Sequence, residues 1–255
     1  MSKSTRGKKY GWQPDLPDHR DRMLLLKPQQ LQTIPPKTDL RLLCPPVYDQ
    51  GALGSCTANA LAGAIEVEQK KQQLPVFTPS RLFVYYNERV IEQSTESDSG
   101  AMLRDGMKTV WSLGACSETL WPYKEDQFAQ KPPAACYAAA RANRVIRYAH
   151  VPQTTDYMKA CLAAGYPFVF GFTVYDSFES DAVAQTGVVP MPDASESVLG
   201  GHAVLAVGYD DATQRFLVRN SWGASWGIRG YFTIPYAYLA SRDLSSDFWT
   251  IRLEE

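Results

Sequence analysis

The stretch RFLVRNSWGASWGIRGYFTI, residues 215–234, contains two short aromatic and β-branched runs, at 215–219 and 230–234. Such runs are typical of β-strands, because these side chains pack well on a pleated, half-buried surface. Asn220 stands where the first run ends, and Trp222 and several glycines follow it. The stretch therefore predicts two strands, with a polar amide at the end of the first.

Two similar runs lie upstream, PFVFGFTVY at 167–175 and HAVLAVGY at 202–209. The polar segment DDATQ at 210–214 separates the second of these from the strand at 215–219. A short polar connection between two strand-like runs predicts a hairpin. The second half of the chain is thus expected to form an antiparallel sheet.

The first half has a different pattern. After Cys56, apolar residues recur at three-and-four spacing, which indicates one buried face of a helix, with Ser55 as a plausible N-cap. Further helical patterns cover 80–93 and 103–113, the latter ended by Gly114. Helices followed by antiparallel strands predict an α+β fold of two lobes with a cleft between them.

The predicted domain organisation has two parts. Residues 1–33 form an N-terminal arm, interrupted by prolines and rich in charge, and residues 34–255 form one body. We expect a helical lobe mainly at 50–140 and a β lobe mainly at 141–255. The arm nevertheless carries apolar residues that a free tail would not need, so we expect it to pack on the body in cis, over the cleft; these are Tyr10, Trp12, Leu16 and Leu24 to Leu26.

Composition excludes several classes of function. The chain has 255 residues with 26 basic and 27 acidic side chains, a net charge of -1, so no field of one sign favours nucleic acid or an anionic membrane. The first residues contain no apolar run of a signal peptide or membrane helix, so the chain as written is expected to be cytoplasmic, with secretion not excluded. No cofactor is expected.

The five cysteines show no Cys-x-x-Cys pair of the kind that binds metal, so no metal site is expected. Because the count is odd, at least one thiol stays unpaired. Four of the five are expected to be structural, as buried thiols or as one disulfide; they are Cys44, Cys116, Cys136 and Cys161.

The fifth, Cys56, opens a predicted helix, where the helix dipole lowers the pKa of a thiol. Of the three histidines, His202 begins a strand after Gly200-Gly201, and glycines there leave room for a substrate backbone. Asn220 can hold the imidazole through its amide oxygen without adding charge. The amide of Gln50 and the backbone N–H of Cys56 can stabilise a developing oxyanion.

Three segments resemble the papain family of cysteine peptidases: QGALGSC at 50–56, GHAVLAVGY at 201–209 and RNSWGASWGIRGY at 219–231. The likeness runs from about residue 34 to 250. It implies a papain-like fold with a helical lobe and an antiparallel β-barrel-like lobe. It also implies that the catalytic residues are Gln50, Cys56, His202 and Asn220. Trp222 is then expected to shield the hydrogen bond between Asn220 and His202 from water.

The resemblance also implies where a peptide or protein substrate binds. It places the groove backbone at Ser99, Gly100 and Ala101, and walls the second subsite with Met102, Leu103, Gly171 and Gly200, beside Gly201. Because two of these walls are glycines, the second subsite is expected to be roomy and apolar.

The sequence also departs from the family pattern. Leu53 stands where the family has a disulfide cysteine, and Thr57 stands where it has an aromatic residue after the nucleophile. The usual long helical propeptide is replaced by about 33 residues, which resembles bacterial members with short leaders and implies a zymogen. The sequence thus predicts a cysteine endopeptidase; the alternatives are a catalytically silent binding scaffold and an acyl-transfer or isopeptidase activity.

Overall fold

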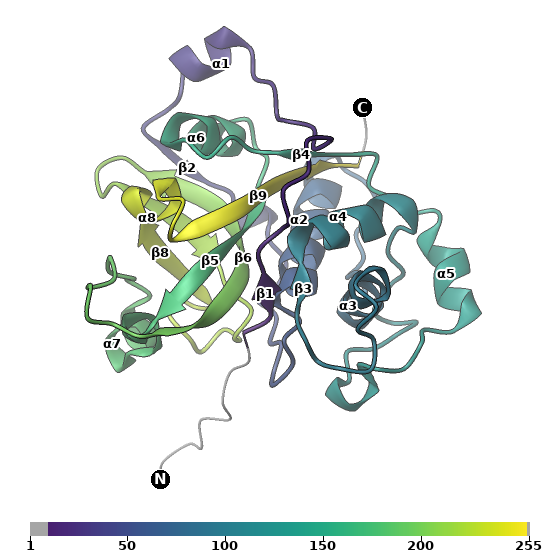
Figure 1. Ribbon diagram of the computed structural model, residues 1–255. Coiled ribbons are helices and arrows are strands. Elements are labelled where there is room, and N and C mark those ends of the chain that lie inside the picture. Colours follow the sequence, from purple (N-terminus) through teal and green to yellow (C-terminus); the bar gives the residue numbers. More distant parts are fainter. Residues whose placement is uncertain (1–9, 254–255) are drawn as a thin grey trace.

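A helical lobe and a sheet lobe lie side by side in the computed structural model, which describes residues 10–253 (Figure 1). Residues 1–9, the first part of the predicted arm, lie outside the described residues. The α+β fold expected from the sequence is confirmed. The helical lobe contains α2 (Cys56–Lys71), α3 (Arg81–Ile91), α4 (Leu103–Ser112), α5 (Ala134–Ala140) and short 3-10 turns at Arg41–Leu43 and Glu125–Gln127.

Helix α2 begins at Cys56, as the sequence predicts, but it is buried on all sides rather than along one face. Residues 56–69 are all buried, because the helix packs against α3 and α4 on one side and against the sheet on the other. A helix covered all round forms the centre of a domain rather than its surface. Cys56 therefore stands where the two lobes meet.

The sheet lobe is a seven-stranded sheet whose strands pair antiparallel, in the order β4-β9-β5-β6-β7-β8, with β2 beside part of β6. The end strands β4 and β8 do not pair with each other, so the sheet is open and not a closed barrel. Its strands are β2 (Lys37–Asp39), β4 (Arg147–His150), β5 (Phe168–Tyr175), β6 (Val198–Asp210), β7 (Arg215–Arg219), β8 (Tyr231–Pro235) and β9 (Ser245–Arg252).

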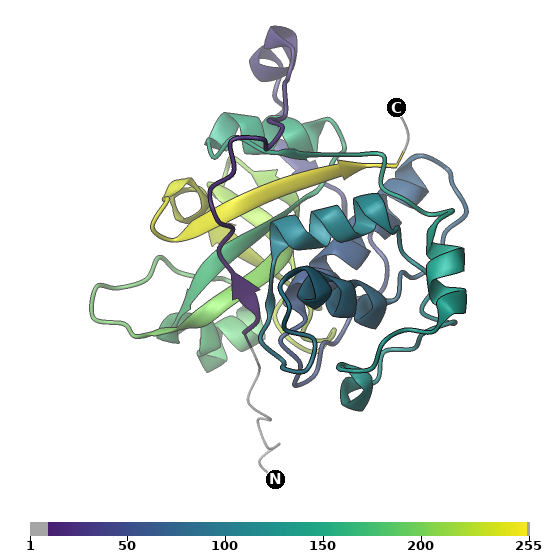
Figure 2. The same ribbon diagram turned by 45° about the vertical axis from the view of Figure 1, so that its right-hand side comes forward.

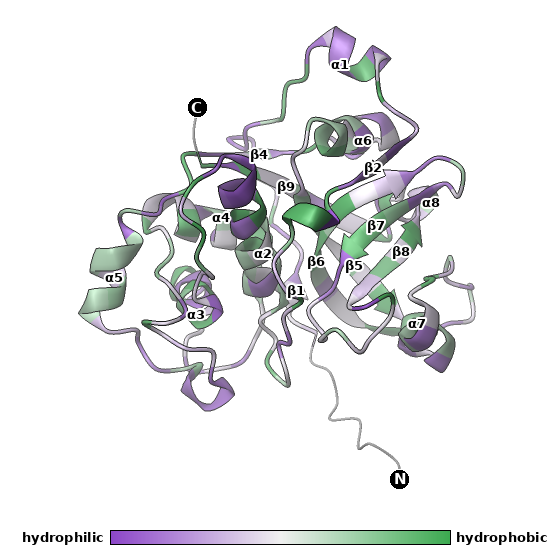
Figure 3. Ribbon diagram, turned by 180° about the vertical axis from the view of Figure 1, so that it is seen from behind, coloured by the Kyte–Doolittle hydropathy of each residue, from purple (hydrophilic) through white to green (hydrophobic). Residues whose placement is uncertain are grey.

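The predicted hairpin is present, since β6 and β7 pair from Leu205↔Arg219 to Asp210↔Arg215. Strand β9 was not singled out from the sequence. The helices around the sheet are α6 (Thr155–Ala163), α7 (Asp181–Thr186) and α8 (Tyr236–Ala240), with a 3-10 turn at Asp176–Glu179. Figure 3 shows hydrophobic residues on β7 and β8, whereas the outlying α1 (Pro28–Gln32) is mostly hydrophilic.

The arm runs between the two lobes and touches both (Figure 2). Its strand β1 (Trp12–Gln13) pairs in parallel with β3 (Ala101–Met102) of the helical lobe. Further along, Leu24 N–H donates to the His150 carbonyl at 2.8 Å, and His150 N–H donates to the Arg22 carbonyl at 2.7 Å. The arm is thus anchored to β4 as well as to β3, which we call the groove strand.

None of the helices in the described part of the chain is both long and apolar enough to cross a membrane.

Candidate active site

Cys56 is completely buried at the start of α2. Its sulfur accepts a hydrogen bond of 3.4 Å from the backbone N–H of Ala203, the residue after His202 on β6. Ser55 precedes the helix, but its side chain makes no capping bond, contrary to expectation. Its hydroxyl instead contacts the Tyr123 hydroxyl at 2.6 Å and accepts from Asn59 Nδ2 at 3.0 Å.

Burial raises the pKa of the Cys56 thiol to about 12, although backbone N–H groups of Ala203, Gly11 and Thr57 partly offset this effect. Desolvation disfavours the thiolate form of a buried thiol. Gly11 belongs to the arm. The segment 10–15 therefore contributes to the environment of the sulfur itself.

His202 lies within β6, which begins at Val198 and not at His202 as the sequence predicted, whereas Asn220 directly follows the end of β7. His202 Nε2 and Asn220 Oδ1 are 2.8 Å apart, and both side chains are buried. The indole of Trp222 stacks on the imidazole, with ring centroids 5.0 Å apart and planes 27° from parallel. The hydrogen bond thus lies in a dry environment, where it is stronger than in water.

Gln50 is buried and fixed by the segment that carries Asn220. Its Oε1 accepts from Ser221 Oγ at 2.6 Å, its Nε2 donates to the Leu53 carbonyl at 2.8 Å, and its backbone N–H donates to the Ser221 carbonyl at 2.9 Å. Ser221, which sequence reasoning did not single out, therefore orients the Gln50 amide so that its donor end faces the turn before Cys56.

The predicted groove residues contact the arm. Ala101 N–H donates to the Gly11 carbonyl at 2.7 Å, and Met102 is paired with Gln13. Gly100 has φ 77°, and a Cβ there would lie 2.1 Å from the Gly11 oxygen, so both conformation and space require glycine. Ser99 is exposed and accepts at its carbonyl from Gln13 Nε2 at 2.8 Å, while Leu103 is fully buried.

Two aromatic residues of the arm cover the glycines of the sheet lobe. Trp12 lies against Gly171 and Gly201, and Tyr10 lies against Gly200 and faces the imidazole of His202 with centroids 6.2 Å apart. The Tyr10 hydroxyl donates to Glu179.

The indole N–H of Trp12 donates to Asp247 Oδ2 at 2.9 Å. The space expected to be apolar therefore contains a carboxylate. Sequence reasoning missed Asp247, and no motif around it would have pointed to it.

Thr57, the departure from the family pattern, has a polar partner of its own. Its hydroxyl donates to Glu88 Oε2 at 2.8 Å, and Glu88 is fully buried. Burial raises the pKa of Glu88 to about 8, so this carboxyl is neutral below that pH. All five cysteines are free thiols, and Leu53 is buried.

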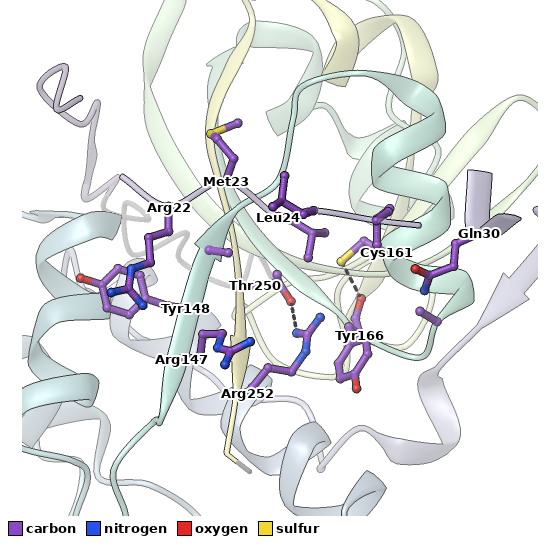
Figure 4. A pocket seen from close by; sticks show the side chains of 14 residues that line it. Arg22, Met23, Leu24, Gln30, Arg147, Tyr148, Cys161, Tyr166, Thr250 and Arg252 are labelled. Atoms are coloured by element: carbon purple, nitrogen blue, oxygen red, sulfur yellow. Dashed lines mark hydrogen bonds between the residues drawn. The ribbon is translucent and has the colours of Figure 1, made fainter. Parts of the chain in front are cut away.

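A pocket of about 660 Å³ lies elsewhere, between the arm and the β4–β9–α6 surface (Figure 4). Its lining includes Arg22, Leu24, Tyr148, Tyr166 and Arg252, and none of the predicted site residues. Among residues 10–253, no group of three or more His, Cys, Asp or Glu side chains is placed to hold a metal ion.

Fold and site together define a thiol-histidine-amide arrangement between a helical and a sheet lobe. The model of the papain family of cysteine proteases matches residues 34–243, so the chain belongs to that family.

The crystal structure of xylellain, a cysteine protease from Xylella fastidiosa, superposes with a TM-score of 0.93 at 43% identity and covers 100% of both chains. An uncharacterized peptidase C1-like protein of Acanthamoeba polyphaga mimivirus is 41% identical over 277 residues, covering 99% of this chain and 89% of that protein. Cathepsin K of Gallus gallus is 27% identical, and the match covers 73% of this chain and 54% of that protein.

Proposed function

We propose that this cysteine protease cleaves internal peptide bonds with Cys56 as nucleophile, His202 as base and then acid, and Asn220 as the group that orients the imidazole. The observation that carries the proposal is the 2.8 Å hydrogen bond from His202 to Asn220. It lies beside Cys56, because the backbone N–H of Ala203, the residue after His202, donates to the Cys56 sulfur. Because an amide oxygen only accepts, Nε2 of His202 donates, and Nδ1 is the basic nitrogen.

In the first half of the reaction, the Cys56 proton passes to His202 Nδ1 and the sulfur attacks the carbonyl carbon of the peptide bond. The oxyanion is stabilised by the Cys56 N–H at the start of α2 and by the Gln50 amide that Ser221 orients. The intermediate then releases the amine, which takes the proton from His202, and leaves a thioester.

In the second half, a water molecule gives a proton to His202 and its oxygen attacks the thioester. Collapse of this intermediate releases the carboxylic acid and returns the proton to the sulfur. Trp222, stacked on the imidazole, keeps water from the hydrogen bond between His202 and Asn220 throughout.

We propose further that the arm inhibits the enzyme in cis. Support comes from the Gly11 and Trp12 contacts, which fill the space over Cys56 and pair with the groove strand. The arm passes the Cys56 sulfur at Gly11 and continues to Trp12, so its chain runs in the N- to C-terminal direction away from the sulfur. The acyl half of a substrate would run in the N- to C-terminal direction toward the sulfur, which is the opposite direction in the same groove. The arm thus occupies the groove without presenting a peptide bond as a substrate does.

The test of the catalytic proposal is Cys56→Ala, with Cys44→Ala as the control at another free thiol. In the full chain and in a Trp12→Ala background, Cys56→Ala should lower the turnover of a fluorogenic peptide by at least about 1,000-fold, whereas Cys44→Ala should not. Persistent turnover in Cys56→Ala would reject the mechanism. Product masses that match amide formation with an added amine would indicate acyl transfer instead of hydrolysis.

A further inference from the structure

The space that the Trp12 indole occupies exists only because two strand residues lack side chains. A Cβ on Gly171 would lie 1.9 Å from Trp12 Cε2, and one on Gly201 would lie 2.6 Å from Trp12 Cε3. Neither glycine has a positive φ. Because the backbone at these positions would accept any residue, space for a large side chain is what the two glycines provide.

The same space is lined by the carboxylate of Asp247, which a β-bulge in the sheet directs toward it. Strand β9 pairs with β5 at Val169↔Trp249 and again at Gly171↔Ser246, so that two residues of β9 face one residue of β5. Such a bulge changes the direction of a side chain. Asp247 lies in the bulge with φ 59°, a left-handed conformation that aspartate tolerates better than most residues, and it is 7% exposed.

Two of the hydrogen bonds to Asp247 come from the arm. Oδ2 accepts from Trp12 Nε1 at 2.9 Å and from the Asp15 backbone N–H at 2.8 Å. The body itself contributes the Ser246 side chain and the nearby ring of His150. When a substrate replaces the arm, both arm donors leave, and a largely buried carboxylate requires a new donor.

We propose that Asp247 makes this pocket select substrates with arginine or lysine at the second residue on the acyl side of the cleaved bond. The inference rests on the proposed function, because Gly11 marks the position at the Cys56 sulfur and Trp12 occupies the next site. A long side chain fits the space between the glycines. Its cationic tip replaces the indole N–H with a charge-assisted hydrogen bond to Asp247, which is stronger than a neutral one.

Arg104 is the cation that could compete for Asp247. Its guanidinium binds Asp21 at 2.6 Å and the Leu16 carbonyl, both in the arm. The charges that raise its own pKa include those of Asp15, Asp21 and Asp18, which also belong to the arm. All of these partners leave with the arm, so in the open groove the cationic side chain of the substrate binds Asp247 in competition with Arg104.

The test uses the full chain with Trp12→Ala, and two peptides that differ only in arginine or leucine at this position. We expect kcat/KM to be about tenfold or more higher for the arginine peptide. Asp247→Asn, which keeps the shape and tolerates the same backbone conformation, should remove most of that ratio. The control Asp243→Asn, which removes an exposed charge four residues away, should leave the ratio unchanged.

Binding separates this inference from the proposed mechanism. In a Cys56→Ala, Trp12→Ala chain, calorimetry should give a correspondingly lower Kd for the arginine peptide than for the leucine peptide, even if catalysis follows another route. Equal or stronger binding of leucine, or an arginine preference that survives Asp247→Asn, would overturn the role of Asp247. Loss of turnover with both peptides, while the binding preference persists, would count against the mechanism alone.

Discussion

The two halves of the arm differ sharply in how they meet the body. Residues 10–24 form β1, pair with the groove strand and with β4, and bury Trp12. Residues 25–33 contain α1, which buries none of its residues, and Leu25 is 87% exposed. Both halves contain apolar residues, so apolar content alone does not decide which part docks. What distinguishes the first half is a set of backbone partners and a space shaped to receive its side chain.

The largest effect on this contrast is expected from Trp12→Ala. Removing a buried tryptophan costs about 3–5 kcal/mol, here taken mostly from docking of the arm. The initial rate on a small peptide should rise by at least about tenfold relative to the unaltered chain. The matched control is Leu25→Ala in the other half of the arm, which should change the rate by less than about twofold. Equal effects of the two variants would show that the arm does not inhibit through its first half.

A smaller effect is expected from Arg104→Ala. The Arg104 guanidinium, largely buried, binds Asp21 and the Leu16 carbonyl, and its loss should weaken docking by about 1.5–3 kcal/mol. Hydrogen exchange of the Ala101 amide, which donates to Gly11, should then be faster.

Arg20→Ala is the control for Arg104→Ala, because its ion pair with Asp18 is exposed and is worth about 0–1 kcal/mol. If Arg20→Ala accelerated exchange as much as Arg104→Ala, anchoring by burial would be the wrong explanation.

The smallest effect is expected from pH. Burial, and then the nearby Asp247, raises the pKa of Asp15 from 3.8 to about 7. The docked arm therefore holds a proton that a free arm releases above about pH 4. Docking is strongest below that pH and weakens as the pH rises through 7.

The rate of the full chain, divided by that of Trp12→Ala, should accordingly rise several-fold between pH 4 and 7. Asp15→Asn should flatten this rise, because asparagine does not titrate. A ratio that is constant with pH in the unaltered chain would contradict the role given to Asp15.

Sequence reasoning reached the His202–Asn220 pair because the two residues lie on, or directly after, strands joined by a short hairpin, where the local pattern sets the register. It also placed Cys56 at the start of a helix. It did not reach Asp247, whose direction depends on a bulge between strands about 75 residues apart in the chain. Nor did it find that the hydroxyls of Ser55 and Ser221 bind Tyr123 and Gln50, because these partners lie far apart in the chain and meet only through packing.

One close approach of the arm to the body involves no side chain. A Cβ on Gly11 would lie 1.7 Å from the Gly54 carbonyl oxygen, and the Gly11 carbonyl in turn lies where a Cβ of Gly100 would be. Three main-chain segments meet there through glycine alone. Side chains elsewhere in the arm and in the groove can therefore diverge between relatives while this contact persists, and a single added methyl group at Gly11 offers an engineer a way to loosen the arm without altering any residue of the body.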